Sequence, residues 1–113
     1  MDERIIDTDF EKFLNRFRKS LTKIMETHPL NRILVVIENN FVKLYILESF
    51  EKASLKRVFR SNHAARLVSH FVANGVTEPI EDDIPYNFTI KNGSCVYVVT
   101  SKELNKIWKI CIE

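Results

Sequence analysis

Three histidines and two cysteines are the residues of this chain best suited to metal binding. His63 and His70 are seven positions apart, so a helix would place them on one face but about 10 Å apart along its axis, too far to share a zinc ion. The sequence contains neither an H-x-x-x-H nor a C-x-x-C spacing. We therefore expect no metal site and no cofactor.

The two cysteines, Cys95 and Cys111, both lie in apolar stretches. Buried, reduced thiols in a reducing compartment are the simplest interpretation, and a disulfide between the two is the alternative. Lys109 is the one basic residue that the local sequence places beside a cysteine, and no G-x-S-x-G turn occurs. Because a nucleophile needs a base within reach, we expect no catalytic site.

Phosphate binding by a glycine-rich loop is not indicated either, because Gly75 and Gly93 are isolated. Four carboxylates gather in one stretch without the spacing of an EF-hand loop, which is typical of a solvated acidic loop. They are Glu78, Glu81, Asp82 and Asp83. The hypothesis of an enzyme has no positive support, and an interaction module is favoured by elimination.

Length and composition indicate one domain, residues 1–113, with an ordinary balance of 45% apolar and 28% charged residues. The net charge of +2 is weaker than that of most nucleic-acid binders, so the charge does not indicate a nucleic-acid partner. The N-terminal stretch does not resemble a signal peptide, and no apolar run approaches the roughly 20 residues that span a bilayer. We expect a cytoplasmic protein that does not insert into membranes.

A first helix is predicted by apolar residues at three- and four-residue steps. They are Phe10, Phe13, Leu14, Phe17, Leu21, Ile24 and Met25. Thr8 and Glu11 form a capping box that predicts the start at Thr8, and Pro29 marks the end. The opposite face carries Lys12, Arg16, Lys19 and Lys23. A solvated helix face is the favoured interpretation, and a basic binding stripe is the alternative.

Two apolar runs, 32–38 and 41–48, predict a hairpin with its turn at Asn39-Asn40, because asparagine tolerates left-handed backbone angles. Both runs are apolar at nearly every position, which is typical of strands covered on both faces. Residues 51–75 fit either one long helix or a strand over 55–60 followed by a helix capped by Ser61 or Asn62. Asn74-Gly75 is a helix stop in either case.

The remaining sequence predicts strands. Residues 76–85 are acidic with two prolines and predict an exposed loop. Residues 86–91 alternate apolar with polar, Asn92-Gly93 predicts a hairpin turn, and 94–100 returns as a valine-rich strand. The last apolar run, 107–112, predicts a closing strand, with a short helix over 102–110 as the alternative. The fold class predicted is α+β with an antiparallel sheet.

Three stretches together resemble the roadblock/LC7 superfamily. "HPLNRILVVIENNFVKLYI" resembles its first hairpin, which is entered from a helix through a proline-containing turn. "RSNHAARLVSHFVANG" resembles its second helix, and "DDIPYNFTIKNGSCVYVV" resembles the strand and the Asn-Gly turn that follow. The resemblance implies the order α-β-β-α-β-β-β, with a central antiparallel sheet flanked by helices. The longer first helix and Asn39-Asn40 in place of a glycine depart from the usual pattern.

The same resemblance implies a non-enzymatic dimerising scaffold that pairs with another roadblock-fold protein, as a homodimer or a heterodimer. Within the superfamily the likeness is to Ragulator subunits, which implies small GTPases as further partners and a location at the lysosomal surface. The partner surface implied is the strand 86–91 together with the helix 66–72. Its candidate anchors are Tyr86, Phe88, Ile90, Leu67, His70 and Phe71. Such an edge strand offers main-chain groups to another chain, but the alternative is that these side chains form the core of the monomer.

A second resemblance implies a different class of function. "CVYVVTSKELNKIW" resembles the end of the Alu-domain proteins of the signal recognition particle, which bind RNA on a sheet beside basic residues. The basic face of the first helix fits that class, whereas the long middle segment and the mild net charge do not. Five strands between helices would favour the roadblock fold, and three strands with a long terminal helix would favour the RNA binder.

Overall fold

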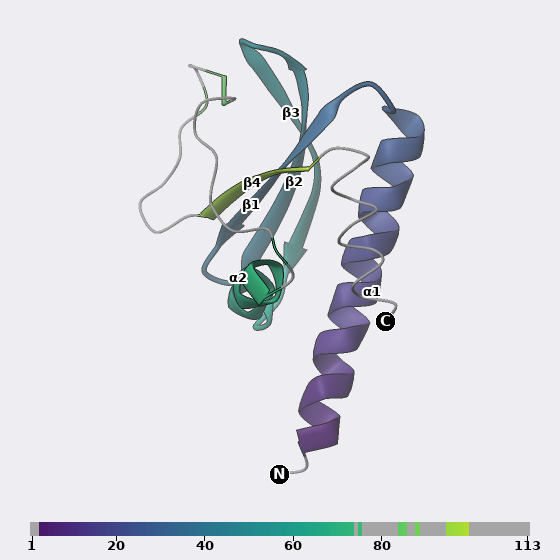
Figure 1. The fold of residues 1–113 in the computed structure, drawn as a ribbon, viewed down its shortest axis with the longest axis vertical. Coiled ribbons are helices and arrows are strands. Elements are labelled where there is room, and N and C mark those ends of the chain that lie inside the picture. The colour runs from purple at the N-terminus through teal and green to yellow at the C-terminus, as the bar shows by residue number, and fades with distance from the viewer. Residues whose placement is uncertain (1–2, 74, 76–83, 86–87, 89–94, 100–113) are drawn as a thin grey trace.

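The computed structural model describes residues 3–73, 75, 84–85, 88 and 95–99 of the chain. The elements are α1 (Glu3–Thr27), β1 (Arg32–Glu38), β2 (Phe41–Ser49), β3 (Lys52–Arg60), α2 (Ala64–Ala73) and β4 (Cys95–Val99) (Figure 1). The described strands form one open antiparallel sheet of four strands in the order β3-β2-β1-β4. The predicted α+β class with an antiparallel sheet is confirmed.

The long helix α1 buries the apolar stripe that the sequence predicts, with Phe17 and Leu21 completely buried. Its predicted start is wrong: α1 begins at Glu3, so Thr8 lies inside the helix. The residues before Thr8 include neither proline nor glycine, and nothing in them ends a helix running toward the N-terminus. The predicted end is confirmed, since the last main-chain bond runs from the His28 N–H to the Ile24 carbonyl (2.8 Å), immediately before Pro29.

The hairpin of β1 and β2 also follows the prediction. The two strands pair from Arg32 opposite Leu47 to Glu38 opposite Phe41. Asn39 in the turn has a φ of 48°, the left-handed conformation that asparagine adopts at lower cost than most residues. The local sequence is thus sufficient to specify this hairpin.

The next segment resolves the ambiguity that the sequence left open, and it corrects the predicted element order. Residues 52–60 form strand β3, which pairs with β2 along most of its length, and a separate helix α2 follows. The order α-β-β-α-β-β-β lacks this strand, because three strands precede α2. A helix over these residues would have left the outer main-chain groups of β2 without a partner strand.

Both ends of α2 follow the prediction. The Ser61 hydroxyl accepts a hydrogen bond from the His63 N–H (3.0 Å), and the Ala64 N–H donates to the Ser61 carbonyl (3.2 Å). At the other end Gly75 has a φ of 92°, and its N–H donates to the Val72 carbonyl (3.2 Å). Glycine fits here because a side chain would strain this left-handed position.

Both helices pack on one face of the sheet, which we call the helix-covered face. α1 contacts β3 and α2 contacts β1, and Figure 1 shows α1 along the β3 side of the sheet. Ile33, Val35 and Ile37 of β1 point into this core, whereas Leu34 and Val36 pack on the other face, which we call the opposite face. β1 is therefore buried on both sides, as its continuous apolar run predicts.

Several predicted elements lie outside the described residues, namely the turn at Asn92-Gly93 and the C-terminal strand or helix over 102–112. β4 confirms the strand predicted over 94–100 at the residues that are described. Phe88 is the one described residue of the predicted strand 86–91, and it is not in a strand. Among the described helices, none has both the length and the apolar character needed to span a membrane.

Candidate functional site

The partner anchors suggested on α2 belong to the core of this chain. Leu67 and Phe71 are both 0% exposed, and both lie in the cluster on the helix-covered face. The Phe71 ring lies 5.8 Å from that of Phe17 and 5.1 Å from that of Tyr97, so it joins α2 to α1 and β4. These two side chains have no exposed surface for a partner. They form part of the core of the monomer, which is the alternative that the sequence left open.

His70 lies at the junction of the two helices. Its ring is half-buried, with its centroid 5.9 Å from that of Phe10 on α1 and 6.4 Å from that of Phe71. Burial lowers the pKa of His70 below its ordinary value, because desolvation disfavours the charged imidazolium. The guanidinium of Arg66 covers the Phe10 ring at 4.4 Å, so both residues take part in the α1–α2 contact.

Phe88 lies on the other side of the sheet from Leu67 and Phe71. It is half-buried and meets Tyr45 of β2 edge to face, with ring centroids 4.9 Å apart. With Ile84 it covers the apolar side chains of the opposite face. The structure thus does not bring the described members of the suggested partner surface together, and Tyr86 and Ile90 lie outside the described residues.

Groups that could do covalent or metal chemistry are few in the described part of the chain. Cys95 is a half-buried free thiol on β4, and Cys111 lies outside the described residues. No three His, Cys, Asp or Glu side chains in the described ranges gather closely enough to hold a metal ion. The chemistry available at the described surface is mainly that of cations.

Two grooves beside α1 collect these cations. The first groove has a volume of about 580 Å³ and lies between α1 and the loop that leads into α2. Its described lining is Lys12, Phe13, Asn15, Arg16, Lys19, Ser61 and His63. The second groove, of about 270 Å³, lies between the C-terminal half of α1 and β3. Its described lining is Ser20, Lys23, Ile24, Thr27, His28, Lys56 and Arg57. Neither described lining includes a carboxylate, so each groove offers three permanent positive charges.

Helix geometry supplies four of these charges. Lys12, Arg16, Lys19 and Lys23 recur at four- and three-residue steps, which places them on one side of α1. All four are exposed, and the row spans about 16 Å of the helix at 1.5 Å per residue. The stripe identified in the sequence therefore lines both grooves.

An irregularity in β3 supplies the other two charges. Arg57 pairs with Leu44 and Leu55 pairs with Tyr45, so Lys56 is an extra residue between consecutive pairs. Neighbouring side chains of a regular strand point to opposite faces, but a bulge redirects one of them. Lys56 and Arg57 consequently both line the second groove.

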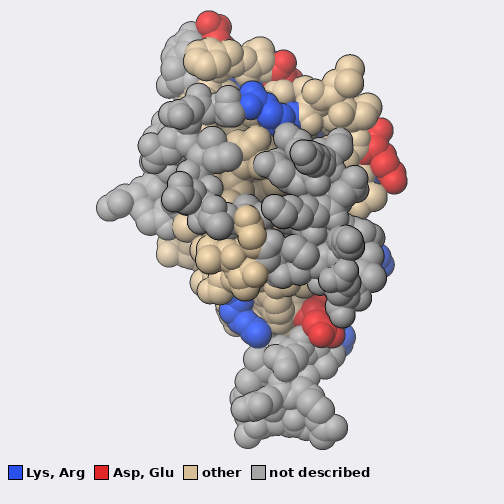
Figure 2. Space-filling model, in the orientation of Figure 1, with Lys and Arg blue, Asp and Glu red and all other residues tan. Residues whose placement is uncertain are grey.

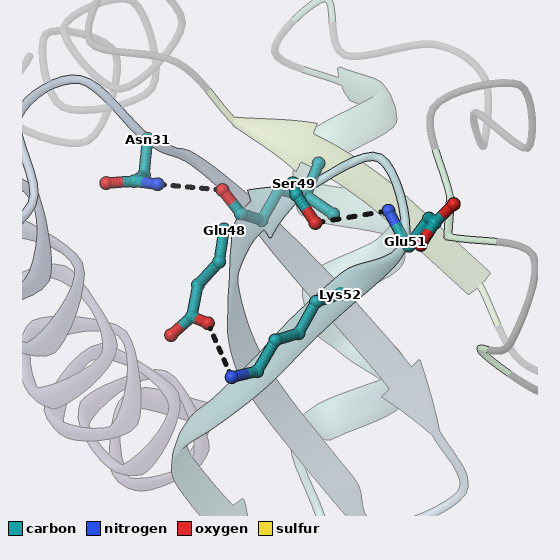
Figure 3. A network of polar contacts seen from close by, with 6 residues as sticks. Asn31, Glu48, Ser49, Glu51 and Lys52 are labelled. Carbon is teal, nitrogen blue, oxygen red and sulfur yellow. Dashed lines mark hydrogen bonds and ion pairs between the residues drawn. The ribbon is translucent and has the colours of Figure 1, made fainter.

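A carboxylate close to Lys56 is held in an ion pair. Glu48 forms an ion pair with Lys52 at 3.1 Å (Figure 3). Its pKa is lowered by hydrogen bonds from Lys52 and Ser54, with a smaller contribution from the charge of Lys56. In the view of Figure 2 the Lys and Arg side chains form separate spots, some of them at the margin where α1 runs.

The polar contacts around Glu48 hold the chain between α1 and β3 in place. The Asn31 side-chain amide donates to the Leu47 carbonyl (2.8 Å), and the Glu51 N–H donates to the Ser49 hydroxyl (3.3 Å) (Figure 3). The first bond ties the connection after α1 to β2, and the second shapes the turn into β3.

Sequence reasoning found the α1 half of this surface but not the β3 half. The cations of 52–60 could not be assigned to a face while the segment had two interpretations, and a bulge leaves no periodic pattern to recognise. Comparisons of the chain with protein-family models, with curated proteins and with solved structures find no match.

Proposed function

We propose that this protein is a non-enzymatic RNA-binding protein that holds the phosphate backbone of RNA in the two grooves beside α1. The observation that carries the proposal is the second groove, where Lys23 of α1 meets Lys56 and Arg57 of β3 and the described lining has no carboxylate. The first groove, lined by three cations of α1, extends this surface. The residues are Lys12, Arg16, Lys19, Lys23, Lys56 and Arg57. A row of like charges on one helix alone would not distinguish an RNA-binding site from an ordinary solvated helix face.

The extent of the surface suits a polyanion. The row on α1 spans about 16 Å, which corresponds to about five steps of a strand that rises 3.4 Å per nucleotide. Lysine and arginine bind phosphate through charge and donated hydrogen bonds without reading the bases. Local concentration of charge also explains how a chain with a net charge of only +2 can present a binding face.

RNA is favoured over other polyanions by the resemblance of the stretch 95–108 to the Alu-domain proteins of the signal recognition particle. That resemblance rests on sequence, whereas the grooves rest on geometry, so the two lines of support are independent.

A salt titration tests the proposal. A labelled single-stranded RNA oligonucleotide is titrated by fluorescence anisotropy at several salt concentrations, first with the unmodified protein. Six groove cations acting together predict a slope of log K against log salt of about −4 for single strands, since each contact contributes about 0.7. Replacing Lys12, Arg16, Lys23 and Arg57 by glutamine should make the slope shallower by about 3 and weaken binding.

A matched control is provided by Lys52 and Arg60, which are basic and exposed but are not among the groove lining. Changing both to glutamine should alter the slope much less. Equal losses per charge removed in the two variants would mean that binding follows total charge only, and the groove assignment would be wrong. No salt-sensitive binding by the unmodified protein would refute the proposed function itself.

A scaffold role in a larger complex is the second candidate, and the open edge of the sheet at β3 favours it. β3 pairs with β2 only, among the described strands, and it carries exposed apolar side chains. This surface differs from the residues that the roadblock/LC7 resemblance indicated. Pairing with a roadblock-fold partner, and through it recruitment of small GTPases at the lysosomal surface, is supported by the resemblance alone.

A further inference from the structure

An exposed apolar patch lies on the opposite face beside the edge strand. It consists of Phe41, Leu55 and Val58, which are 37%, 50% and 43% exposed, and we call it the edge patch. Val58 is opposite Lys43 and Leu55 is opposite Tyr45 in the β2–β3 register. Phe41, Lys43 and Tyr45 are two positions apart along β2, so their side chains point to the same face. Val58 and Leu55, which lie opposite Lys43 and Tyr45, therefore share that face with Phe41.

The bulge at Lys56 is what creates this patch. Leu55 and Val58 are an odd number of residues apart, so a regular strand would place them on opposite faces of the sheet. The extra residue restores both to the same face, and it leaves Lys56 and Arg57 at the groove on the helix-covered side. The bulge thus places Leu55 and Val58 on the patch side, which also carries Arg60 opposite Phe41, and it leaves Arg57 on the helix-covered side with Phe59.

A hollow adjoins the patch. Its described lining is Glu38, Asn39, Phe41, Lys43 and Val58, and its volume is about 370 Å³. The Lys43 ammonium and the Glu38 carboxylate are 2.6 Å apart, and this hydrogen bond raises the pKa of Lys43. Because these charges satisfy each other, the hollow offers mainly the apolar surfaces of Phe41 and Val58. Its volume is in the lower part of the range of small-molecule pockets, about 300–1000 Å³.

The charge of β3 determines which strand could pair with it. The strand contains Lys52, Lys56, Arg57 and Arg60 and no carboxylate. Pairing β3 with β3 of a second copy would bring like charges together, which is unfavourable across paired strands. Basic residues on an edge also discourage indiscriminate pairing. A strand with carboxylates would instead be attracted.

We propose that an extended acidic segment of a partner protein adds, as a further strand, to the edge of β3 that no described strand occupies. Its apolar side chains would alternate with carboxylates, so that one side packs on the edge patch and the other side meets Lys56 and Arg57. Main-chain bonds would supply affinity, and the two-sided pattern would supply specificity. This inference rests on the second candidate function, and RNA binding does not depend on it.

The test uses labelled ten-residue peptides and the full chain. The first peptide alternates valine with glutamate, and the second has the same composition in two blocks. A third alternates valine with lysine. We expect saturable binding of the first peptide, and binding at least ten times weaker for the other two. N-methylation of alternate residues along one edge of the first peptide should abolish binding, because it removes main-chain donors.

The variant Leu55→Thr with Val58→Thr keeps residues suited to a strand while it removes apolar surface. It should weaken binding of the alternating acidic peptide at least about tenfold, a difference of about 1.4 kcal/mol, and leave the RNA titration unchanged. Circular dichroism checks that the variant is folded. The control variant Val72→Thr changes an exposed apolar residue on α2, away from the patch, and should have no effect.

The outcomes separate the inference from the function on which it rests. Binding of the lysine peptide in preference to the glutamate peptide would overturn the acidic partner but leave an interaction edge at β3. If neither alternating peptide binds, β3 is not an interaction edge, and both the acidic-strand inference and the scaffold role proposed for this edge are overturned. Binding that the double threonine variant does not weaken would show attraction by charge alone, and the edge patch would then have no part in docking.

Discussion

Replacing Phe71 by alanine tests whether the buried face of α2 is core or partner surface. The ring is completely buried and lies 5.8 Å from Phe17 and 5.1 Å from Tyr97. It therefore connects α2 to the long helix and to β4. A residue in this position should contribute to the stability of the isolated chain, whatever the chain binds.

The expected magnitude follows from the buried area. A buried phenylalanine removes about 150 Å² or more from water, which at about 25 cal/mol/Å² corresponds to about 4 kcal/mol. Alanine retains part of this term, while the cavity and the lost ring contacts with Phe17, His70 and Tyr97 add to the cost. We expect the free energy of unfolding to fall by about 3–5 kcal/mol. For a chain of 113 residues, with an unfolding entropy of about 0.24 kcal/mol/K, Tm should fall by about 13–21 °C.

Thermal and urea unfolding followed by circular dichroism measure this loss. Val72, the next residue, is 49% exposed, and Val72→Ala should cost less than about 1 kcal/mol. If Phe71→Ala melts within a few degrees of the unmodified protein while Val72→Ala is strongly destabilised, the buried face of α2 has been assigned to the wrong residues.

Two further predictions concern the turn and the helix junction. Asn39→Val should destabilise the chain by about 1–2 kcal/mol in urea unfolding, because a β-branched residue is strained at a φ of 48°, whereas Asn39→Gly should be close to neutral; equal effects would refute the turn geometry. Burial lowers the pKa of His70 below its ordinary 6.5, so the folded protein binds a proton less readily than the unfolded chain. The stability that neutral His70 contributes to the folded protein is therefore complete above about pH 6.5, and it is lost as pH falls through the lowered pKa of the folded state. Melts between pH 7.5 and 5.5 should show a drop in Tm that His70→Gln reduces, and an equal drop in both proteins would exclude His70 as its source.

Much of the fold was predictable because it depends on local patterns. The stripe of α1, the hairpin turn at Asn39 and the ends of α2 at Ser61 and Gly75 each follow from residue types a few positions apart. The start of α1 was missed because a capping box at Thr8 also fits inside a longer helix. A sequence of this kind marks where a helix can begin, and the upstream residues decide whether it does.

The candidate site was predictable only in half. Lys23 could be placed on the basic side of α1 from spacing alone, but its neighbours across the second groove could not be identified. Lys56 and Arg57 reach that groove because a bulge interrupts the alternation of β3. No periodic rule detects one extra residue, since the shift exists only relative to the partner strand β2.

Sequence by itself determined which segments are amphipathic, where the first hairpin turns and that β1 is covered on both sides, because periodicity and backbone preference act over a few residues. Tertiary structure alone decided that residues 52–60 form a strand, that Leu67 and Phe71 face the core and that the basic rows of α1 and β3 meet. Each of these depends on what lies across the contact. An apolar or charged side chain has the same sequence pattern whether its neighbour is solvent, the same chain or another molecule.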